Sequence, residues 1–315
     1  MKKTISVLLT VIFFVGFLSA CVKDKEIIAK KGLSIISTIF PGYDFASHIV
    51  GDKVFVKMLL TPGAESHSFE PTAQDIISIQ NCDLFIYVGG ENDTWVDSIL
   101  SSFDKPVKTL KMIDCVTAVE EEIKEGMETE QHSHETNKDP EYDEHVWTSP
   151  QNAIKITQKI ADTLSEISPS NSEKFKQNTV SYITELSNLD NSFKDFFASI
   201  KNKTLIFADR FPMQYFTDAY GLDYYAAFPG CAGETEPSAA TVAYLINKIQ
   251  SEKIKAVYYI ELSNHKVADG IAEDTGVQAR QINTCHNVTK EQFAEGATYV
   301  SLMEENLRTF KETMN

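Results

Sequence analysis

The sequence predicts an α/β protein of two lobes, each a parallel sheet flanked by helices, joined by one long rigid helix. Short apolar, β-branched runs alternate with segments of helical spacing in both halves of the chain, as in parallel βαβ units. Between the halves, residues 170–200 are uninterrupted by Gly or Pro and carry the clearest helical periodicity. The length of 315 residues also favours two lobes over one core.

The first lobe is expected over residues 33–168. Pro-Gly and Gly-Gly pairs end three of its apolar runs, which sets the limits of the expected strands. Strands are predicted over 33–39, 54–60, 83–88 and 107–110. Helical spacing predicts helices over 43–50, 71–80 and 95–103.

Residues 169–201 are predicted to form the linker helix between the lobes. Large apolar residues recur there at spacings of three, four and seven, namely Phe175, Tyr182, Leu186, Leu189, Phe193, Phe196 and Ile200. Pro169 after Ser168 is typical of a helix start. A helix of about 30 residues would span roughly 45 Å. The alternative is two helices broken near residues 188–191.

The second lobe is expected over residues 202–315, where the alternation resumes. Strands are predicted over 204–208, 256–260 and 278–282. Helices are predicted over 212–220, 237–251, 265–275 and 299–310, with Gly276 as a C-cap.

The first twenty residues are predicted to be a lipoprotein signal peptide. Two lysines precede an apolar run, and small residues lead to Cys21. The run is too short for a confident membrane-spanning helix. Its end, Leu-Ser-Ala-Cys, resembles a bacterial lipobox, which implies that Cys21 is lipidated and that residues 21–32 form a tether. The alternative is an uncleaved anchor with an incidental cysteine.

The net charge of −16 bears on the partners. Nucleic-acid binding needs a basic footprint, so it is excluded, and so is broad contact with anionic lipid. The membrane link should therefore be the acyl anchor alone. Residues 119–144 are dense in Glu, contain His132 and His134, and have almost no apolar side chain, so they are expected to form a mobile, solvated loop.

Three of the seven histidines follow predicted strands or lie in loops where a strand would end: His67, His145 and His286. The carboxyl ends of parallel strands form the binding crevice of such sheets. Neutral imidazole is a common zinc ligand, so three at strand ends suggest a metal site. Any one of them alone would more often be a hydrogen-bonded surface or core residue.

Two histidine blocks resemble the signatures of the zinc and manganese ABC-transporter solute-binding proteins (cluster A-I). Residues 62–71 read Pro-Gly-Ala-Glu-Ser-His-Ser-Phe-Glu-Pro, and residues 143–147 read Asp-Glu-His-Val-Trp. The C-terminal pattern of Gly296, Tyr299, Met303 and Asn306 is also similar to the family's. The resemblance covers about residues 33–310.

The resemblance implies a lipid-anchored, extracytoplasmic protein on the outer face of the cytoplasmic membrane. Such a protein would capture Zn²⁺ between its lobes as a monomer and deliver it to an ABC permease and its ATPase partner. It would not be an enzyme. Mn²⁺ is the alternative cargo, although three imidazoles favour zinc over manganese.

The second lobe departs from the family's pattern. The family's second-lobe His falls on Arg210, a permanent cation that cannot be a ligand, and its acidic ligand falls near Asn283. We favour His286 as the third ligand. Nearby substitutes are Asp209, Glu234, Glu236 and Cys231.

Some of these candidates have other readings. Asp209 could instead pair with Arg210, and Glu236 could be a helix N-terminal acid. Glu70 could cap a helix or orient a ligand. Cys231 and Cys285 lie in loops expected to face the cleft, where a disulfide is favoured over a thiolate ligand.

Two other functional classes compete with transport. A secreted zinc hydrolase would need a general base such as Glu70 or Glu236, but the sequence has no H-E-x-x-H and no G-x-S-x-G. A surface adhesin could use the same lobes, and the sequence does not exclude it as an added role.

Overall fold

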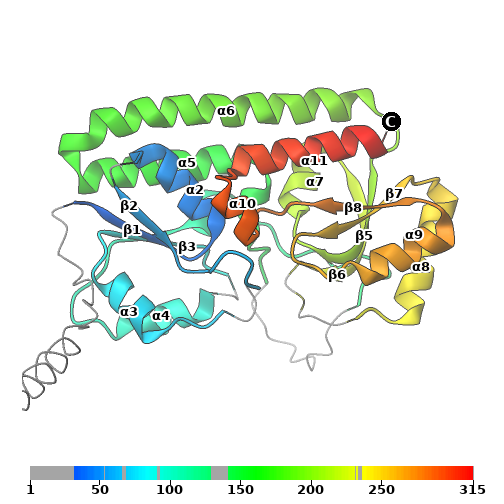
Figure 1. Cartoon of the computed structure of the whole chain (residues 1–315), viewed down its shortest axis with the longest axis horizontal. Coiled ribbons are helices and arrows are strands. Elements are labelled where there is room, and N and C mark those ends of the chain that lie inside the picture. The colour runs from blue at the N-terminus through cyan, green and yellow to red at the C-terminus, as the bar shows by residue number, and fades with distance from the viewer. Residues whose placement is uncertain are drawn as a thin grey trace, which may run out of the picture. The chain divides into compact units, whose positions relative to one another are not determined.

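The computed structural model describes residues 32–314, apart from 53, 66–68, 91–92, 129–140, 231 and 233–235. Several predictions fall outside the described residues: the signal peptide, lipidated Cys21, His67, His132, His134, Cys231 and Glu234. Two four-stranded parallel sheets lie side by side, and α6 extends across both (Figure 1). The predicted fold class is confirmed.

The first sheet has the strand order β2-β1-β3-β4, and all its pairs are parallel. Its strands are β1 (Ser34–Ser37), β2 (Phe55–Met58), β3 (Leu84–Tyr87) and β4 (Thr109–Lys111). Its helices are α2 (Phe40–Val50), α3 (Ala73–Gln80), α4 (Thr94–Ser101) and α5 (Pro150–Ile167), with short 3₁₀ turns at Met112–Cys115 and Val146–Thr148. The helices of the strand crossovers cover both faces of the sheet, as parallel sheets require.

The predicted linker is one continuous helix, α6 (Ser172–Ser199), preceded by a 3₁₀ turn at Pro169–Asn171. At 1.5 Å per residue, its 28 residues span about 42 Å. It does not break near residues 188–191, so the two-helix alternative is wrong. The predicted apolar stripe is the buried face of this helix, except for Ile200, which is its C-cap.

The second sheet has the order β6-β5-β7-β8, again all parallel. Its strands are β5 (Thr204–Phe211), β6 (Asp223–Pro229), β7 (Ala256–Ile260) and β8 (Gln278–Ile282). Its helices are α7 (Gln214–Tyr220), α8 (Ala239–Glu252), α9 (Lys266–Thr275), α10 (Lys290–Ala294) and α11 (Tyr299–Thr313). Gly276 caps α9 in the left-handed conformation, as predicted.

Two α-helices and one strand were not predicted: α5, α10 and β6. Buried Ile156, Ile160 and Leu164 recur every four residues in α5, a pattern that is readable in the sequence. Strand β6 is rich in aromatic and small apolar residues and pairs with the edge of β5. It completes a second sheet of the same strand order as the first.

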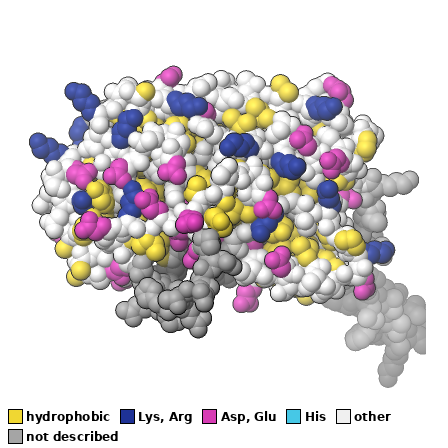
Figure 2. Space-filling view, turned by 180° about the vertical axis from the view of Figure 1, so that it is seen from behind, with side chains coloured by type: hydrophobic (Ala, Val, Ile, Leu, Met, Phe, Trp, Pro, Cys, Tyr) yellow, Lys and Arg dark blue, Asp and Glu magenta, His cyan; other side chains and the backbone are white. Residues whose placement is uncertain are grey.

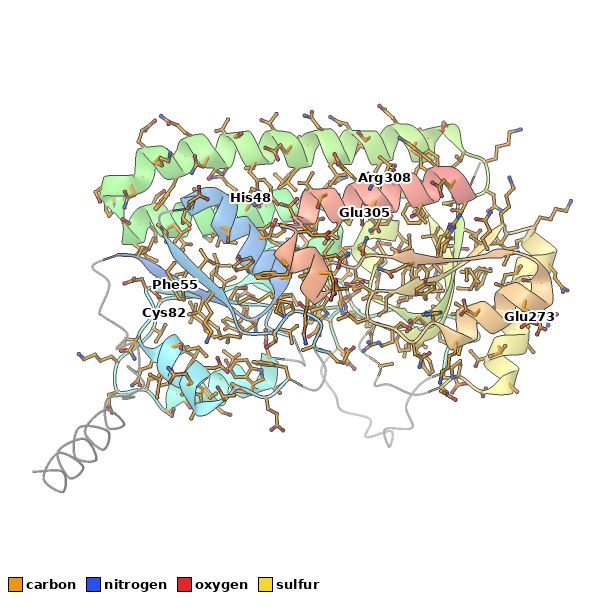
Figure 3. The ribbon with its side chains drawn as sticks, viewed as in Figure 1. His48, Phe55, Cys82, Glu273, Glu305 and Arg308 are labelled. Carbon is orange, nitrogen blue, oxygen red and sulfur yellow. The ribbon has the colours of Figure 1, made fainter. Side chains whose placement is uncertain are left out.

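One hydrophobic cluster joins the two lobes. It contains Ile35 of β1, Leu186 of α6 and Tyr258 of β7, all at most 1% exposed. His48 of α2, labelled in Figure 3, stacks on Tyr182 of α6 with ring centroids 4.0 Å apart. Because the lobes share a core, large independent movement of either lobe would expose apolar surface and is costly.

The first part of the acidic segment is folded, so the prediction of a solvated loop is wrong for residues 119–128. The backbone N–H of Glu128 donates to the Ala227 carbonyl of β6 at 2.9 Å. The backbone N–H of Val119 donates to the Tyr215 hydroxyl at 3.2 Å. Gly126 lies so close to the Tyr244 ring that a Cβ there would clash. Composition did not reveal this anchoring, because the contacts come from the second lobe.

On the face shown in Figure 2, acidic and basic side chains are interspersed among apolar ones. Within the part of the chain that the structure describes, no helix is both long and apolar enough to cross a membrane.

Candidate metal centre

A small cavity of about 30 Å³ lies between the lobes. Its lining residues from the first lobe are Ala64, Glu65 and His145. Those from the second lobe are Arg210, Pro212, Gly230, Ile260, Glu261, Leu262, Thr284, His286 and Asn287. Organic ligands usually occupy pockets of about 300–1,000 Å³, so this cavity suits an ion or a few waters.

His145 is held by the carboxylate two residues before it. Its Nδ1 and its backbone N–H both lie 2.8 Å from Oδ1 of Asp143, and both residues are 1% exposed. A carboxylate on Nδ1 fixes the ring and leaves Nε2 for a metal. Burial lowers the pKa of His145, but the Asp143 charge and hydrogen bond outweigh burial, so the pKa is raised.

The backbone of Gly230 packs against His145 from the second lobe. A Cβ at Gly230 would lie 3.2 Å from His145 Cε1 and 3.1 Å from the Phe211 carbonyl oxygen. Glycine therefore allows the two lobes to approach closely at the cavity.

His286 follows β8 in a loop that a buried carboxylate braces. Glu261, at the end of β7, accepts hydrogen bonds from the backbone N–H and hydroxyl of Thr284, each at 2.6 Å, and from the backbone N–H of His286 at 3.2 Å. Cys285 between them has φ 61°, the left-handed region. Burial raises the pKa of Glu261, while these hydrogen bonds act in the opposite direction.

Two of the cavity's lining residues, His145 and His286, are in ring contact with each other and with Trp147. The centroids of His145 and His286 are 5.6 Å apart, and Trp147 lies 5.5 Å from His145 and 5.0 Å from His286. The structure thus brings together two of the three predicted ligands, one from each lobe.

The His286 loop belongs to the second lobe in sequence but is fastened to the first lobe. Trp147 Nε1 donates to the Thr284 carbonyl at 2.9 Å. Asn287 Nδ2 donates to the carbonyls of Thr61 and Ala64, both at 2.9 Å. Gly63 N–H donates to the Val288 carbonyl at 2.7 Å. His286 is therefore held in register with His145 through the first lobe.

Arg210 reaches the cavity beside a register shift of β5, between Phe207 and Arg210. Such bulges redirect side chains. The Asp209 carboxylate accepts from the backbone N–H groups of Arg210 at 2.8 Å and Ile260 at 3.4 Å. Asp209 does not line the cavity. It braces the bulge, which is neither the ligand role nor the side-chain ion pair considered from the sequence.

The other described candidates lie away from the cavity. Glu70 and Glu236 are exposed, and the caps of α3 and α8 are Thr72 and Ser238. Asn283 donates through its amide to α11.

Cys285 is a free cysteine, fully buried in the core. Its loop does face the cleft, since Thr284, His286 and Asn287 line the cavity, but Cys285 itself is not a lining residue and belongs to the hydrophobic core. Its predicted disulfide partner, Cys231, lies outside the described residues.

The sequence contained signals for three further groups. Asp143 precedes His145 by two residues, Glu261 directly follows a predicted strand, and Glu65 lies within the first histidine block. None of these three acids was among the residues predicted to form the site. Among the described residues, which exclude His67, no three His, Cys, Asp or Glu side chains group closely enough to hold a metal.

Comparison with known proteins gives a family match and close relatives. The profile of ZnuA, "Zinc-uptake complex component A periplasmic", matches residues 35–313. The zinc-binding lipoprotein AdcA of Streptococcus pneumoniae is 34% identical over 302 residues, which is 94% of this chain and 58% of AdcA. The chain thus spans 58% of that relative's length. The high-affinity zinc uptake system protein ZnuA of Bacillus subtilis is 32% identical, covering 90% of this chain and 88% of its own.

Solved structures of related proteins share this fold. The Zn(II)-bound ZnuA-like domain of Streptococcus pneumoniae AdcA superposes with a TM-score of 0.72 at 31% identity, over 90% of this chain and 99% of that one. The laminin-binding protein Lmb of Streptococcus agalactiae shares the fold, with a TM-score of 0.76 at 21% identity over 90% of this chain and 100% of its own.

Proposed function

This chain belongs to the family of zinc-uptake complex component A, and from that premise we propose that it captures Zn²⁺ in the interlobe cavity and delivers it to an ABC importer. The observation that carries the proposal is that the rings of His145 and His286 lie 5.6 Å apart between centroids, one from each lobe. The Nδ1 atom of His145 is hydrogen-bonded to the Asp143 carboxylate. His67 would complete the imidazole set, on the strength of its sequence motif.

Zinc is proposed over manganese because the site presents imidazoles. Zinc accepts nitrogen and oxygen ligands in a tetrahedral arrangement, whereas manganese prefers more oxygen donors. The names of the relatives point the same way, because AdcA and ZnuA are described as zinc proteins.

Those names describe binding and uptake, not catalysis. The cavity between the lobes, of about 30 Å³, suits an ion better than an organic substrate. We therefore place the chain as the binding component of a transporter, with a permease and its ATPase as partners.

Lipid attachment at Cys21 is the proposed membrane link of a monomeric protein on the outer face of the cytoplasmic membrane. AdcA is itself named a lipoprotein. Mass spectrometry of the native protein should find a lipid-modified N-terminal Cys21. A mature form that begins at another residue would contradict the anchor.

Competition titration of the metal-free protein tests the cargo. We expect one tightly bound Zn²⁺ per chain and binding of Mn²⁺ weaker by about tenfold or more. Replacing His132 and His134 together by Gln should leave that tight site unchanged. Tighter binding of manganese than zinc would replace the proposed cargo, and loss of zinc in the double variant would place a ligand in the 129–140 segment.

A further inference from the structure

Leu262 lies at the mouth of the cavity between the lobes. It lines the cavity and is 39% exposed, whereas every other described residue that lines the cavity is buried or half-buried. A residue that borders both the cavity and the solvent lies where one opens to the other. An apolar side chain therefore stands at the opening of a cavity that is otherwise lined largely by polar and charged residues.

The backbone of Leu262 is in the left-handed region, with φ 64°. Glycine adopts this conformation without strain, but in other residues Cβ comes too close to the following carbonyl oxygen, so a bulky leucine is rarely found there. Because the residue is exposed, packing in the core does not account for a leucine at this position. Strained residues of this kind are concentrated at ligand-binding sites, which points to a role for the side chain at the cavity.

The turn that carries Leu262 is braced on both sides. Glu261, directly before it, accepts three hydrogen bonds from the 284–286 loop, at 2.6, 2.6 and 3.2 Å. The backbone N–H of Ser263, directly after it, donates to the Ile260 carbonyl at 3.4 Å. Leu262 is thus fixed relative to the loop that supplies the proposed second-lobe ligand.

From this geometry we propose, building on the proposed function, that Leu262 is a lid over the metal site. Its side chain keeps water and competing ligands away from the bound metal and so slows release. The metal enters or leaves when the 261–263 turn opens, and the strain at Leu262 lowers the free energy needed for that opening. Because Leu262 supplies no ligand atom, it controls the rates of capture and release more than the affinity.

Zinc release after mixing with a chromogenic chelator in stopped flow tests the lid. We expect Leu262→Ala to release Zn²⁺ at least about tenfold faster than wild type. The equilibrium affinity from a competition titration should fall by about threefold or less, because association is also faster. Unchanged release in Leu262→Ala, or a loss of affinity as large as the gain in release rate, would overturn the proposal.

Glycine at the same position tests the strain. Leu262→Gly and Leu262→Ala both remove the side chain, but only glycine relieves the left-handed backbone, so metal-free Leu262→Gly should melt about 1–2 °C above Leu262→Ala. Equal melting temperatures would overturn the role of strain.

The matched control is Lys253→Gly. It relieves another left-handed residue of the second lobe, with φ 56°, that does not line the cavity. This variant should release zinc like wild type. Fast release in Lys253→Gly would overturn the assignment of the release rate to Leu262.

Failure of the proposed function looks different. Wild-type protein without a tight zinc site would overturn both ideas. A wild-type site that binds zinc tightly, and that releases it at the same rate in Leu262→Ala, would overturn this inference alone.

Discussion

Replacing Asn287 by Ala should loosen the junction between the His286 loop and the first lobe. The Asn287 side chain is buried, and its Nδ2 supplies two hydrogen bonds of 2.9 Å to the carbonyls of Thr61 and Ala64. Each hydrogen bond contributes about 1 kcal/mol net, so the variant should lose about 2 kcal/mol of the free energy of unfolding. The loss should not be larger, because Thr61 is exposed and water can reach its carbonyl. With an unfolding entropy of about 2.1 cal/mol/K per residue over about 280 residues, that lowers Tm by about 3–4 °C.

The assay is calorimetry of the metal-free protein, followed by a zinc titration at a temperature where the variant is fully folded. Asn287 directly follows His286, and its two hydrogen bonds fasten the His286 loop to the first lobe, so Asn287→Ala should also weaken zinc binding. Asn264→Ala is the matched control, because Asn264 is an exposed loop asparagine of the same lobe whose side chain accepts a hydrogen bond from the nearby backbone N–H of Lys266. If both variants melt alike and bind zinc alike, Asn287 does not join the lobes in the way described.

Three further outcomes are expected. Tyr182→Phe removes the 2.7 Å hydrogen bond to buried Asp44 and should cost about 1.5–3 kcal/mol in denaturant unfolding at neutral pH; an unchanged midpoint would contradict the role of that bond. Burial raises the pKa of Asp93 from 3.8 to about 6, so the folded state binds the proton more tightly than the unfolded state does. The free energy of unfolding should therefore fall by about 3 kcal/mol from this group as the pH rises from about 4 to 6. Asp93→Asn should flatten that part of the pH profile of stability, and a profile identical to wild type would refute this role. The Asp143 carboxylate outweighs burial and raises the pKa of His145, so protons should compete with zinc at pH values above the usual pKa of histidine. Zinc affinity should therefore fall as the pH drops through that raised pKa. Zinc affinity that does not depend on pH would argue against His145 as a ligand.

The fold was largely readable from the sequence because its signals are local. The ends of the apolar runs at Pro-Gly and Gly-Gly pairs predicted the strands of the first sheet, and the stripe from Phe175 to Phe196 predicted α6. The anchoring of residues 119–128 was not readable, because its partners, such as Ala227 and Tyr215, are about a hundred residues away.

The site was only partly readable for the same reason. His145 lies in a recognisable motif and His286 comes after a predicted strand, so both could be found in the sequence. The direction of a side chain after a bulge or a left-handed residue depends on tertiary contacts, which the sequence does not display. The Asp209 carboxylate accepts hydrogen bonds from two backbone N–H groups, and Cys285 is buried in the core. Glu261 belongs to no recognisable motif, although it directly follows β7 and so has the same kind of position after a strand that pointed to the histidines.

The most direct test of the metal centre compares zinc affinity in His286→Ala, Asp209→Ala and Glu236→Ala. His286 lines the cavity beside His145, Asp209 braces the β5 bulge, and Glu236 is exposed. We predict that His286→Ala weakens zinc binding by at least about 10- to 100-fold, while Glu236→Ala binds like wild type and Asp209→Ala acts mainly on stability. Wild-type affinity in His286→Ala, together with loss of binding in Asp209→Ala or Glu236→Ala, would contradict this site and point to an oxygen-rich one with manganese as the candidate cargo.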